Sequence, residues 1–579
     1  MLKSFLMITV LIISSVLVLV LVSFKSFKNH QVTKEPQSRP NVIVILADDM
    51  GYSDLGCYGG EAQTPNLDKL AANGLRYTQF YNMTRCCPSR AALLTGLYPH
   101  QTGMGWMTTD DYQLPGYRGN INKNCVTMAE ALKENGYATY MTGKWHLNFH
   151  PEKNKSKENW PLQRGFEKYY GIILGAANYY DPGYLCRDNI LITPQNDTEY
   201  KPAQYYFTDA ISDNSVKYIQ DRDKQKPFFM YVAYTAPHWP LQAPEEVIQK
   251  YKGRFDKGWE KLREERLNRM KSLGVISKDA VLSASDGKPW AQEKDKPAMI
   301  RRMETYSAMI DVMDQGVGRI INTLKQQGIY NNTVILFLQD NGACAEMIGA
   351  GEVKPVGENV NNLKAPGPND LTFLNNPPIT RQGKLVMQGK QVIAGPADTY
   401  VAYLKDWANV SNTPFRLYKH DVNEGGISTP LIIHWPEGIK NKGAIRSQIA
   451  HEIDILPTIL DITKTSYPKL YNDNKITPMA GISLVPTFSN KPLNREAIFW
   501  EHEMNKAVRM GKWKLLSEAK LTGMNYKAGP WELYDIDADR SEEHNLAASN
   551  PVLVEKMIKL WETYAHKTQV YPSPWTEIK

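Results

Sequence analysis

The chain has 579 residues, too many for one small domain, and its 42% hydrophobic content is ordinary for a globular protein. The net charge of +7 at pH 7 is concentrated at the start, since residues 1–40 hold five basic side chains and one glutamate. The rest of the charge is spread thinly, so nothing indicates nucleic-acid binding. The six cysteines form no CxxC pair, and they imply neither a zinc site nor a disulfide scaffold.

The chain opens with an uncharged apolar segment, Ser4–Phe24, whose length suits a bilayer span. No small-x-small cleavage site follows it, so we expect residues 1–24 to be a signal anchor, with a cleaved signal peptide as the alternative. Lys25 and Lys28 follow the segment, and the positive-inside rule would favour the opposite, cytoplasmic orientation. We favour export, and expect an extracytoplasmic protein that is periplasmic, secreted or membrane-anchored, with residues 25–40 as a tether.

Apolar runs with the pattern of strands buried on both faces of a parallel sheet recur after this tether. They are Asn41–Ala47, Tyr137–Met141, Phe228–Ala233, Val334–Leu338 and Pro430–Trp435. Helical patterns lie between them, one with Thr64 as the expected N-cap and another with a capping box of Thr127 and Glu130. This alternation predicts an α/β catalytic domain over residues 41–475, with a large, mostly parallel sheet flanked by helices.

The later parts of the chain have different patterns. Residues 251–296 are charged and helical in their first half, and residues 345–413 are rich in Gly, Pro and Asn, which predicts a long irregular insertion. Short strand patterns after residue 476 precede an amphipathic helix, Pro551–His566. We therefore expect residues 476–579 to form a small C-terminal α+β domain, an antiparallel sheet with one helix.

Polar side chains lie at the ends of the predicted strands, where open parallel sheets bind ligands. They are Asp48, Asp49, Lys144, His146, His238, Asp340 and Asn341, with Lys419 and Glu424 just before the last strand. Each alone has an ordinary explanation as a turn, a cap or a surface residue. Together, three carboxylates and an amide oxygen suit Ca²⁺ or Mg²⁺. Two lysines and two histidines beside them suit a tetrahedral oxyanion, which predicts hydrolysis of a phosphate or sulfate ester.

A second feature is the stretch TRCCPSRAALLTG, Thr84 to Gly96. Pro88 fits the first turn of a helix that Gly96 ends. Cys86 is then expected just before a helix N-terminus, where free N–H groups and the helix dipole favour an anion. Arg90, one turn further on, can reach the same anion.

The pattern C-x-P-S-R-x-x-x-x-T-G in this stretch resembles the signature of the formylglycine-dependent (type I) sulfatases, in the alkaline-phosphatase superfamily. Residues 407–430 resemble the bacterial-type arylsulfatases in particular. The resemblance covers nearly everything after the tether, through the segments PNVIVILADDMGYSDLGCYGG, GKWHL, PHWP, QDNG, KHDVNEGGISTPLIIHWP and EHEMNKAVRMGKWKLL. Gln339 and Asn423 depart from residues common in the family, and they bear on substrate preference rather than reaction class.

The resemblance implies an arylsulfatase-type sulfuric ester hydrolase. A formylglycine-generating enzyme would oxidise Cys86 to formylglycine (3-oxoalanine), whose hydrated geminal diol attacks sulfur, and Cys87 would occupy a variable position. The implied metal ligands are Asp48, Asp49, Asp340, Asn341 and the modified Cys86, around Ca²⁺ or, as second choice, Mg²⁺. The implied substrate-binding and catalytic residues are Arg90 and Lys144 on the diol and sulfate, Lys419 and His238 on the sulfate ester, and His146 in sulfate release.

Chemical logic agrees with these roles, because a diol keeps a second hydroxyl whose deprotonation by His146 expels sulfate. Asp340 can take the proton of the attacking hydroxyl, and His238 beside Lys419 can protonate the leaving group. The expected partner is a sulfated small molecule or glycan, and phenols, steroids and lipids stay open as its leaving group. A phosphonate or phosphate ester hydrolase on the same fold and an inactive, membrane-tethered binding protein are the competing interpretations.

Overall fold

The computed structural model of the chain describes residues 39–153, 155–358, 360–374 and 377–577. The predicted signal segment, 1–24, and almost all of the tether, 25–40, lie outside these residues. Within the described ranges, no helix combines the length and the apolar character that crossing a membrane requires. Pro40–Lys579 forms one compact unit, so the predicted boundary between residues 475 and 476 stays a prediction.

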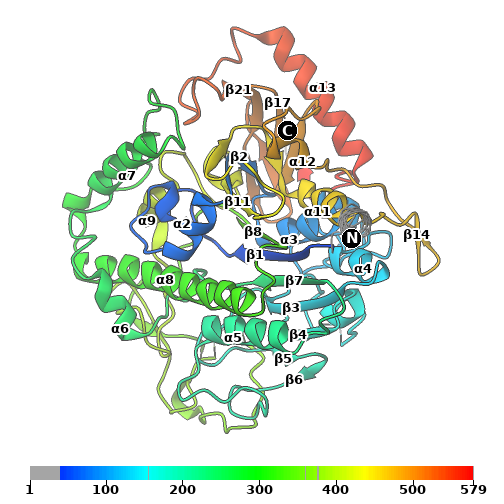
Figure 1. Ribbon diagram of the computed structural model, residues 1–579. Helices are drawn as coiled ribbons and strands as arrows, with labels where there is room; N and C mark the ends of the chain where they lie inside the picture. Colours follow the sequence, from blue (N-terminus) through cyan, green and yellow to red (C-terminus); the bar gives the residue numbers. More distant parts are fainter. Residues whose placement is uncertain (1–38, 154, 359, 375–376, 578–579) are drawn as a thin grey trace, which may run out of the picture. The chain divides into compact units, whose positions relative to one another are not determined.

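A large mixed sheet is the centre of this unit (Figure 1). Its order is β12-β2-β11-β8-β1-β7-β3-β4-β5-β6, with β13 beside β2. The strands are β1 (Asn41–Ala47), β2 (Leu75–Tyr81), β3 (Ala138–Lys144), β4 (Lys168–Ile172), β5 (Leu185–Arg187), β6 (Ile190–Leu191), β7 (Phe228–Ala233), β8 (Thr333–Gln339), β11 (Ser428–His434), β12 (Ala444–Arg446) and β13 (Ala450–His451). The central strands β8, β1, β7, β3 and β4 are parallel, which confirms the mostly parallel sheet.

Strand β11 differs from the expected parallel pattern, because it runs antiparallel to both of its neighbours, β2 and β8. An antiparallel strand brings its beginning, rather than its end, to the edge where the parallel strands finish. The residues just before β11 therefore reach the same edge as the residues just after β1, β3, β7 and β8. Because β11 is buried on both faces, its sequence is a continuous apolar run, and such a run does not indicate whether the strand is parallel or antiparallel to its neighbours.

Helices cover both faces of the sheet. Alternate residues of β1 separate the two cores: Ile43 and Ile45 pack on the side of α2, α5 and α8, and Val42 and Val44 pack on the side of α3, α4 and α11. These helices are α2 (Pro65–Ala72), α5 (Phe207–Gln220), α8 (Lys296–Gln326), α3 (Cys86–Thr95), α4 (Met128–Glu134) and α11 (Ile455–Thr463). Figure 1 shows α5 and α8 side by side, and α8 is the longest of the described helices.

The two predicted caps have different outcomes. At α4 the capping box is present, with Glu130 N–H donating to the Thr127 hydroxyl (3.1 Å) and Thr127 N–H donating to the Glu130 carboxylate (2.7 Å). At α2, Thr64 is the N-cap residue, as predicted, but its hydroxyl makes no hydrogen bond to the first turn of the helix. The hydroxyl accepts from Gly56 N–H (2.9 Å) and donates to Asp68 (3.0 Å) instead.

The charged segment contains α7 (Trp259–Leu273), as predicted. The insertion is largely irregular, with the two-residue strands β9 (Lys354–Pro355) and β10 (Met387–Gln388), but its last part forms the helix α9 (Leu404–Ser411). Shorter helices also occur near these segments, namely α6 (Glu245–Ile248), α10 (Glu424–Ile427) and α12 (Val485–Phe488).

The C-terminal part has the predicted antiparallel sheet, ordered β16-β17-β18-β21, with α13 (Pro551–Lys567) packed on β17 and β18. Its strands are β16 (Ile498–His502), β17 (Asn505–Met510), β18 (Trp513–Ser517) and β21 (Glu532–Asp535). Smaller sheets pair β14 (Leu470–Tyr471) with β15 (Asn474–Lys475), and join β19 (Ala519–Thr522), β20 (Asn525–Ala528) and β22 (Thr576–Glu577). Strands β16 and β17 are joined by a two-residue turn, Glu503 and Met504, with positive φ of 52° and 64°.

Candidate active site

Cys86 is the first residue of α3, with Arg85 as the N-cap, so Pro88 lies in the first turn as predicted, but Cys86 lies within that turn rather than just before it. Gly96 ends the helix with a φ of 67°, as expected. The Cys86 side chain is buried, and a hydrogen bond from the Cys87 thiol, aided by Lys144 and His146, lowers its thiol pKa well below the ordinary value despite that burial. In formylglycine, oxygen would stand where this sulfur stands.

Two buried carboxylates and two buried cations form the inner half of the site. Lys144, the last residue of β3, donates to Asp48 at 2.7 Å. Arg90 donates to Asp340 at 2.8 Å and lies 3.5 Å from Asp48. A second donor of Arg90 bonds the backbone carbonyl of Lys144 at 3.0 Å. These contacts fix one turn of α3 to the ends of β1, β3 and β8.

Asp49 organises the outer half. Lys419 Nζ donates to its carboxylate at 3.0 Å, His238 Nε2 lies 3.3 Å from Oδ2, and Asn341 Nδ2 donates to Oδ1 at 2.7 Å. Asp49 N–H in turn lies 3.3 Å from Asp340 Oδ1, to which it donates. The structure therefore brings together all the residues that the sequence singled out, except Glu424.

The charges of this group are strongly coupled. Burial, reinforced by Asp48, raises the pKa of Asp340 to about 8. Burial also acts to raise the pKa of Asp49, but Lys419 and His238 outweigh it and hold that pKa below the ordinary value. Lys419 keeps its proton, because Asp49 raises its pKa well above the ordinary value in spite of burial. Without a further cation, three carboxylates crowd one dry space.

The donor set fits a hard divalent cation. Asp48 Oδ1 and Asn341 Oδ1 are buried, and neither has a hydrogen-bond partner among the described residues. Unpartnered buried oxygens are costly, and the ligands that Ca²⁺ and Mg²⁺ prefer are carboxylate and amide oxygens of this kind. A cation would also relieve the repulsion between Asp48 and Asp340.

His146 and His238 lie at different places in the site. One ligand atom each from Cys86, Cys87 and His146 lies within 4.8 Å of the others, and burial lowers the pKa of His146 to about 4. Gly175 packs against the His146 ring so closely that a Cβ would lie 2.3 Å from it. His238 Nδ1 lies 2.6 Å from the carbonyl of Trp239, which can only accept, so Nδ1 carries a proton and Nε2 faces Asp49.

The sequence reasoning missed Glu346, in the loop after β8. Its carboxylate accepts from Trp239 Nε1 at 2.6 Å, and it lies 3.6 Å from Lys419 Nζ and 3.3 Å from His420 Nε2. No motif or spacing signals this residue, because its partners come from distant segments. Glu424 lies apart from the sheet-edge group, since its carboxylate pairs with Lys514 and Arg540 at 3.2 Å each.

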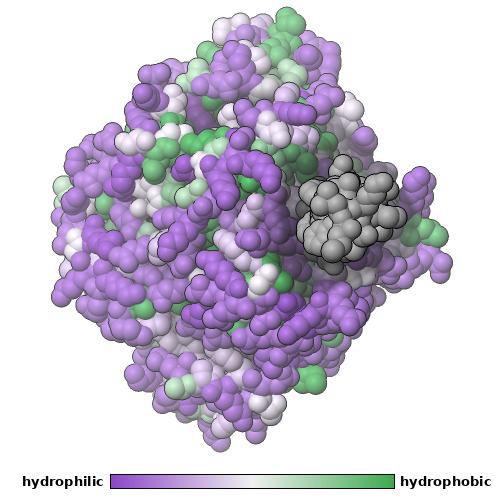
Figure 2. Space-filling view, viewed as in Figure 1, coloured by the Kyte–Doolittle hydropathy of each residue, from purple (hydrophilic) through white to green (hydrophobic). Residues whose placement is uncertain are grey.

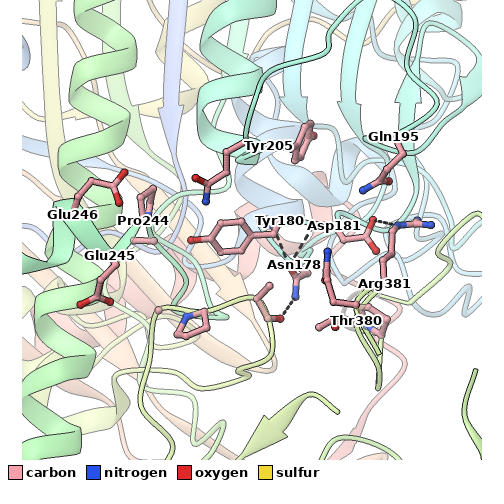
Figure 3. A pocket seen from close by; sticks show the side chains of 17 residues that line it. Asn178, Tyr180, Asp181, Gln195, Tyr205, Pro244, Glu245, Glu246, Thr380 and Arg381 are labelled. Atoms are coloured by element: carbon pink, nitrogen blue, oxygen red, sulfur yellow. Dashed lines mark hydrogen bonds and ion pairs between the residues drawn. The ribbon is translucent and has the colours of Figure 1, made fainter. Parts of the chain in front are cut away.

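The cavity shown in Figure 3 is a different space, of about 520 Å³. Asn178, Tyr180 and the Asp181–Arg381 ion pair point into it, and its described lining includes none of the predicted site residues. Tyr179, between two lining residues in the sequence, is linked to the site, since its hydroxyl donates to the backbone carbonyl of His238 at 2.9 Å.

Comparisons with known proteins identify the family of the chain. The family profile described as sulfatase matches residues 40–465, and the profile described as N-sulphoglucosamine sulphohydrolase, C-terminal, matches residues 416–567. An uncharacterized sulfatase of Schizosaccharomyces pombe is 32% identical, covering 93% of this chain and 96% of the relative. An arylsulfatase of Klebsiella aerogenes is 33% identical, covering 80% and 94% respectively.

A solved structure in complex with its substrate, D-glucosamine-2-N,6-O-disulfate, has the same fold, with a TM-score of 0.58, 22% identity and coverage of 93% of this chain and 99% of that one. The matched profile spans both the Cys86 helix and the strand ends that carry the carboxylates and cations. The motif, the fold and the relatives thus converge, and the chain belongs to the formylglycine-dependent sulfatase family of the alkaline-phosphatase superfamily, as a sulfuric ester hydrolase.

Proposed function

We propose that the buried group around Cys86 is the catalytic site, and that it cleaves sulfate esters with formylglycine at position 86 and Ca²⁺ at the carboxylates. One observation carries this proposal. At one buried edge of the sheet, Cys86 and the cations of Arg90, Lys144 and Lys419 lie beside three carboxylates, those of Asp48, Asp49 and Asp340. An isolated cation cluster would bind an anion, but a cation cluster tied to carboxylates can also hold a metal beside it.

The metal would be held by Asp48, Asp49, Asp340 and Asn341 together with the modified Cys86. When bound, Ca²⁺ supplies a Lewis acid that polarises oxygens bonded to sulfur and favours ionisation of a nearby hydroxyl. All four unmodified ligands offer oxygen, so we expect Ca²⁺ first and Mg²⁺ second.

Binding of the sulfate group falls to the cations. Arg90 and Lys144 approach the Cys86 side from the inner half of the site, and Lys419 approaches from the outer half. Each is held on a carboxylate before substrate arrives, so the donors are already oriented, and little reorganisation is needed when charge develops.

Proton movements fall to the histidines and Asp340. His146, neutral because of its burial, lies beside Cys86 and can accept a proton there. Asp340 accepts from Arg90 at 2.8 Å, and a cation bound beside it would keep its carboxylate ionised, in the form that receives a proton. His238 offers Nε2 on the side of Lys419 and Asp49, and an anionic substrate would favour its charged form, which can protonate the leaving oxygen.

Sulfated glycans are the substrate class that we propose first. The structurally similar protein bound to a disulfated glucosamine supports this choice, and the arylsulfatase relative makes aryl sulfates the second class. From the apolar segment 1–24 we infer an extracytoplasmic location, and from Cys86 we infer maturation by a formylglycine-generating enzyme.

Mass spectrometry of the peptide that contains Cys86, after co-expression with a formylglycine-generating enzyme, tests the modification. Parallel assays on the sulfate, phosphate and phosphonate esters of 4-nitrophenol then test the reaction class. We expect formylglycine at position 86 and a clear preference for the sulfate ester. Unmodified cysteine in an active enzyme, or a preference for the phosphonate, would contradict the proposal.

A further inference from the structure

A cluster of two histidines and a carboxylate lies outside the machinery described above. His420 follows Lys419, and His502 and Glu503 lie at the end of β16 and in the β16–β17 turn. One ligand atom from each of the three residues lies within 4.8 Å of the other two. The cluster thus joins the catalytic lysine loop to the C-terminal sheet.

His502 is the member whose environment is hardest to explain. Its side chain is fully buried, and neither ring nitrogen has a hydrogen-bond partner among the described residues. The ring stacks on Trp106, with centroids 5.3 Å apart and planes 19° from parallel. Burial lowers its pKa to about 3, so the imidazole is neutral and keeps a lone pair available. A buried lone pair without a partner is costly unless something binds it.

The other two members are held by charged neighbours: the Glu346 and Glu503 carboxylates outweigh burial and raise the pKa of His420, so a metal that binds His420 displaces a proton. His420 Nδ1 lies 3.3 Å from Glu503 Oε2, and its second nitrogen, Nε2, lies 3.3 Å from Glu346 Oε1. A carboxylate behind the second nitrogen is the usual support of a histidine that binds a metal. The opposite oxygen of Glu503, Oε1, accepts from Arg85 at 2.7 Å.

The backbone near these groups has unfavourable conformations. Glu503 and Met504 both have positive φ in a two-residue turn that normally selects Asn and Gly. His420 has a φ of 86°, again in a region that non-glycine residues rarely adopt. Strained residues of this kind gather at functional sites. Here two such residues, His420 and Glu503, lie in contact with each other.

We propose that His420, His502 and Glu503 form a second metal site, specific for Zn²⁺ or a similar nitrogen-preferring divalent cation. Two imidazoles and one carboxylate are a common ligand set for zinc, and they leave a fourth position open. This donor set differs from the all-oxygen set at Asp48 and Asp340, so the two sites select different metals.

The geometry allows the site to close with side-chain movement alone. Tetrahedral zinc with bonds of about 2.1 Å needs ligand atoms roughly 3.4 Å apart. The pair of His420 and Glu503 already has this spacing, and the remaining atoms must approach by about 1 Å or slightly more from the 4.8 Å limit. The side chains of His420 and Glu503 are 27% and 18% exposed, so solvent can reach the open position. Arg85 and Lys419 lie close by, and their charge will moderate the affinity.

Zinc titration of the full chain tests the proposal. The protein is first stripped with a chelator and then saturated with Ca²⁺, so that the oxygen-ligand site does not compete. Isothermal titration with Zn²⁺ should show one saturable site per chain, and Co²⁺ in its place should give the intense visible absorption of a tetrahedral complex. His420→Asn and Glu503→Gln should each abolish saturable binding, and Glu346→Gln should weaken it about 10- to 100-fold.

His544→Asn is the matched control, because His544 is 77% exposed on its side chain and pairs only with Asp539 among the described residues. It should leave zinc binding unchanged. The proposal is overturned if the Ca²⁺-saturated protein binds no stoichiometric Zn²⁺, or if the His420 and Glu503 variants bind it as well as the parent chain. Hydrolysis of 4-nitrophenyl sulfate before any zinc is added shows separately whether the proposed sulfatase activity holds.

Discussion

Cys86 and Cys87 are neighbours in the first turn of α3, but their surroundings differ. Cys86 is close to Lys144 and His146, and burial raises the pKa of Cys87 well above the ordinary thiol value. We therefore expect Cys86→Ala to lose about 10⁴-fold or more in kcat/KM, since the nucleophile is gone. Cys87→Ser should retain most of the activity, because only one buried thiol changes. Initial rates on 4-nitrophenyl sulfate measure both, and equal rates in the two variants would refute the assignment.

The dependence of the rate on the leaving group tests the role of His238 as the general acid. A general acid matters less when the leaving group is already a weak base. His238→Ala should thus lose about 10²–10⁴-fold on an alkyl sulfate and far less on 4-nitrophenyl sulfate. A series of phenyl sulfates with graded leaving-group pKa, assayed with both chains, measures the change in slope. Equal slopes would remove His238 from this step.

His146 has a different expected signature. It lies beside Cys86 rather than beside Lys419, so its loss should impair a step after the phenol has left. With His146→Ala we expect a rapid release of about one phenol per chain, followed by slow turnover. Stopped-flow absorbance at millisecond resolution records the burst, with His150→Ala, a partly buried histidine nearby in the sequence, as the control. A linear time course without a burst would contradict the role.

Most members of the central group could be predicted from the sequence because they follow strongly apolar runs, while Cys86 and Arg90 were found through the motif at the start of a helix. Asp48, Asp340 and Lys144 are recognisable in this way, since strand ends in a parallel sheet share an edge. Glu346 could not be found in the same way. Its neighbours Trp239 and Lys419 are more than seventy residues away in both directions, and only the folded chain brings them together.

Among the elements, the bounds of the strands were predicted better than the strand directions and the helix starts. The bounds of β1 and β7 match the apolar runs, but the direction of β11 does not follow from its own residues. The beginning of α2 follows from Thr64 and Pro65, although the Thr64 hydroxyl bonds to neighbours other than the first turn of the helix. At α3, Cys86 belongs to the first turn instead of preceding it, because Arg85, in an extended conformation, is the N-cap.

The buried ion cluster between α10 and β18 gives a prediction at this scale. Lys514 lies 3.2 Å from Glu424 and 2.8 Å from Glu542, and all three side chains are inaccessible. Lys514→Met would leave the Glu542 carboxylate buried without its cation and Glu424 with Arg540 alone, and should reduce the free energy of unfolding by about 3–5 kcal/mol. Urea denaturation followed by tryptophan fluorescence measures the loss.

Lys512 offers a control from the same hairpin. Its side chain is 47% exposed and pairs with Asp535 at 2.6 Å. Lys512→Met should cost less than about 1 kcal/mol, because exposed ion pairs contribute little. If the two variants unfold at the same urea concentration, the cluster does not anchor the C-terminal sheet to the loop that carries Lys419.

For the whole molecule, metal binding should be visible as stability. A ligand at 100 times its Kd stabilises the folded state by about 2.7 kcal/mol, which in a chain of this size raises Tm by a few degrees, roughly 2–5 °C. We expect this rise with Ca²⁺, a smaller one with Mg²⁺, and none in Asp340→Asn. Differential scanning calorimetry measures these changes in Tm, and elemental analysis of the purified protein identifies the bound metal. Zinc at the oxygen site in place of calcium would contradict the proposed donor preference.

The contact between Glu346 and Lys419 has one more consequence. These residues stand at the two ends of the long irregular insertion, and their charged groups are 3.6 Å apart. The insertion therefore leaves and re-enters the fold at almost the same point, and lengthening such a closed loop adds little entropic cost. Natural selection can vary the exposed part of the intervening segment, which includes Val353 and Phe373 and gives Thr380 and Arg381 to the cavity of Figure 3, while α9, whose Trp407 is fully buried, is kept. A new substrate preference can thus arise through changes in this exposed part of the insertion, while the catalytic residues stay the same.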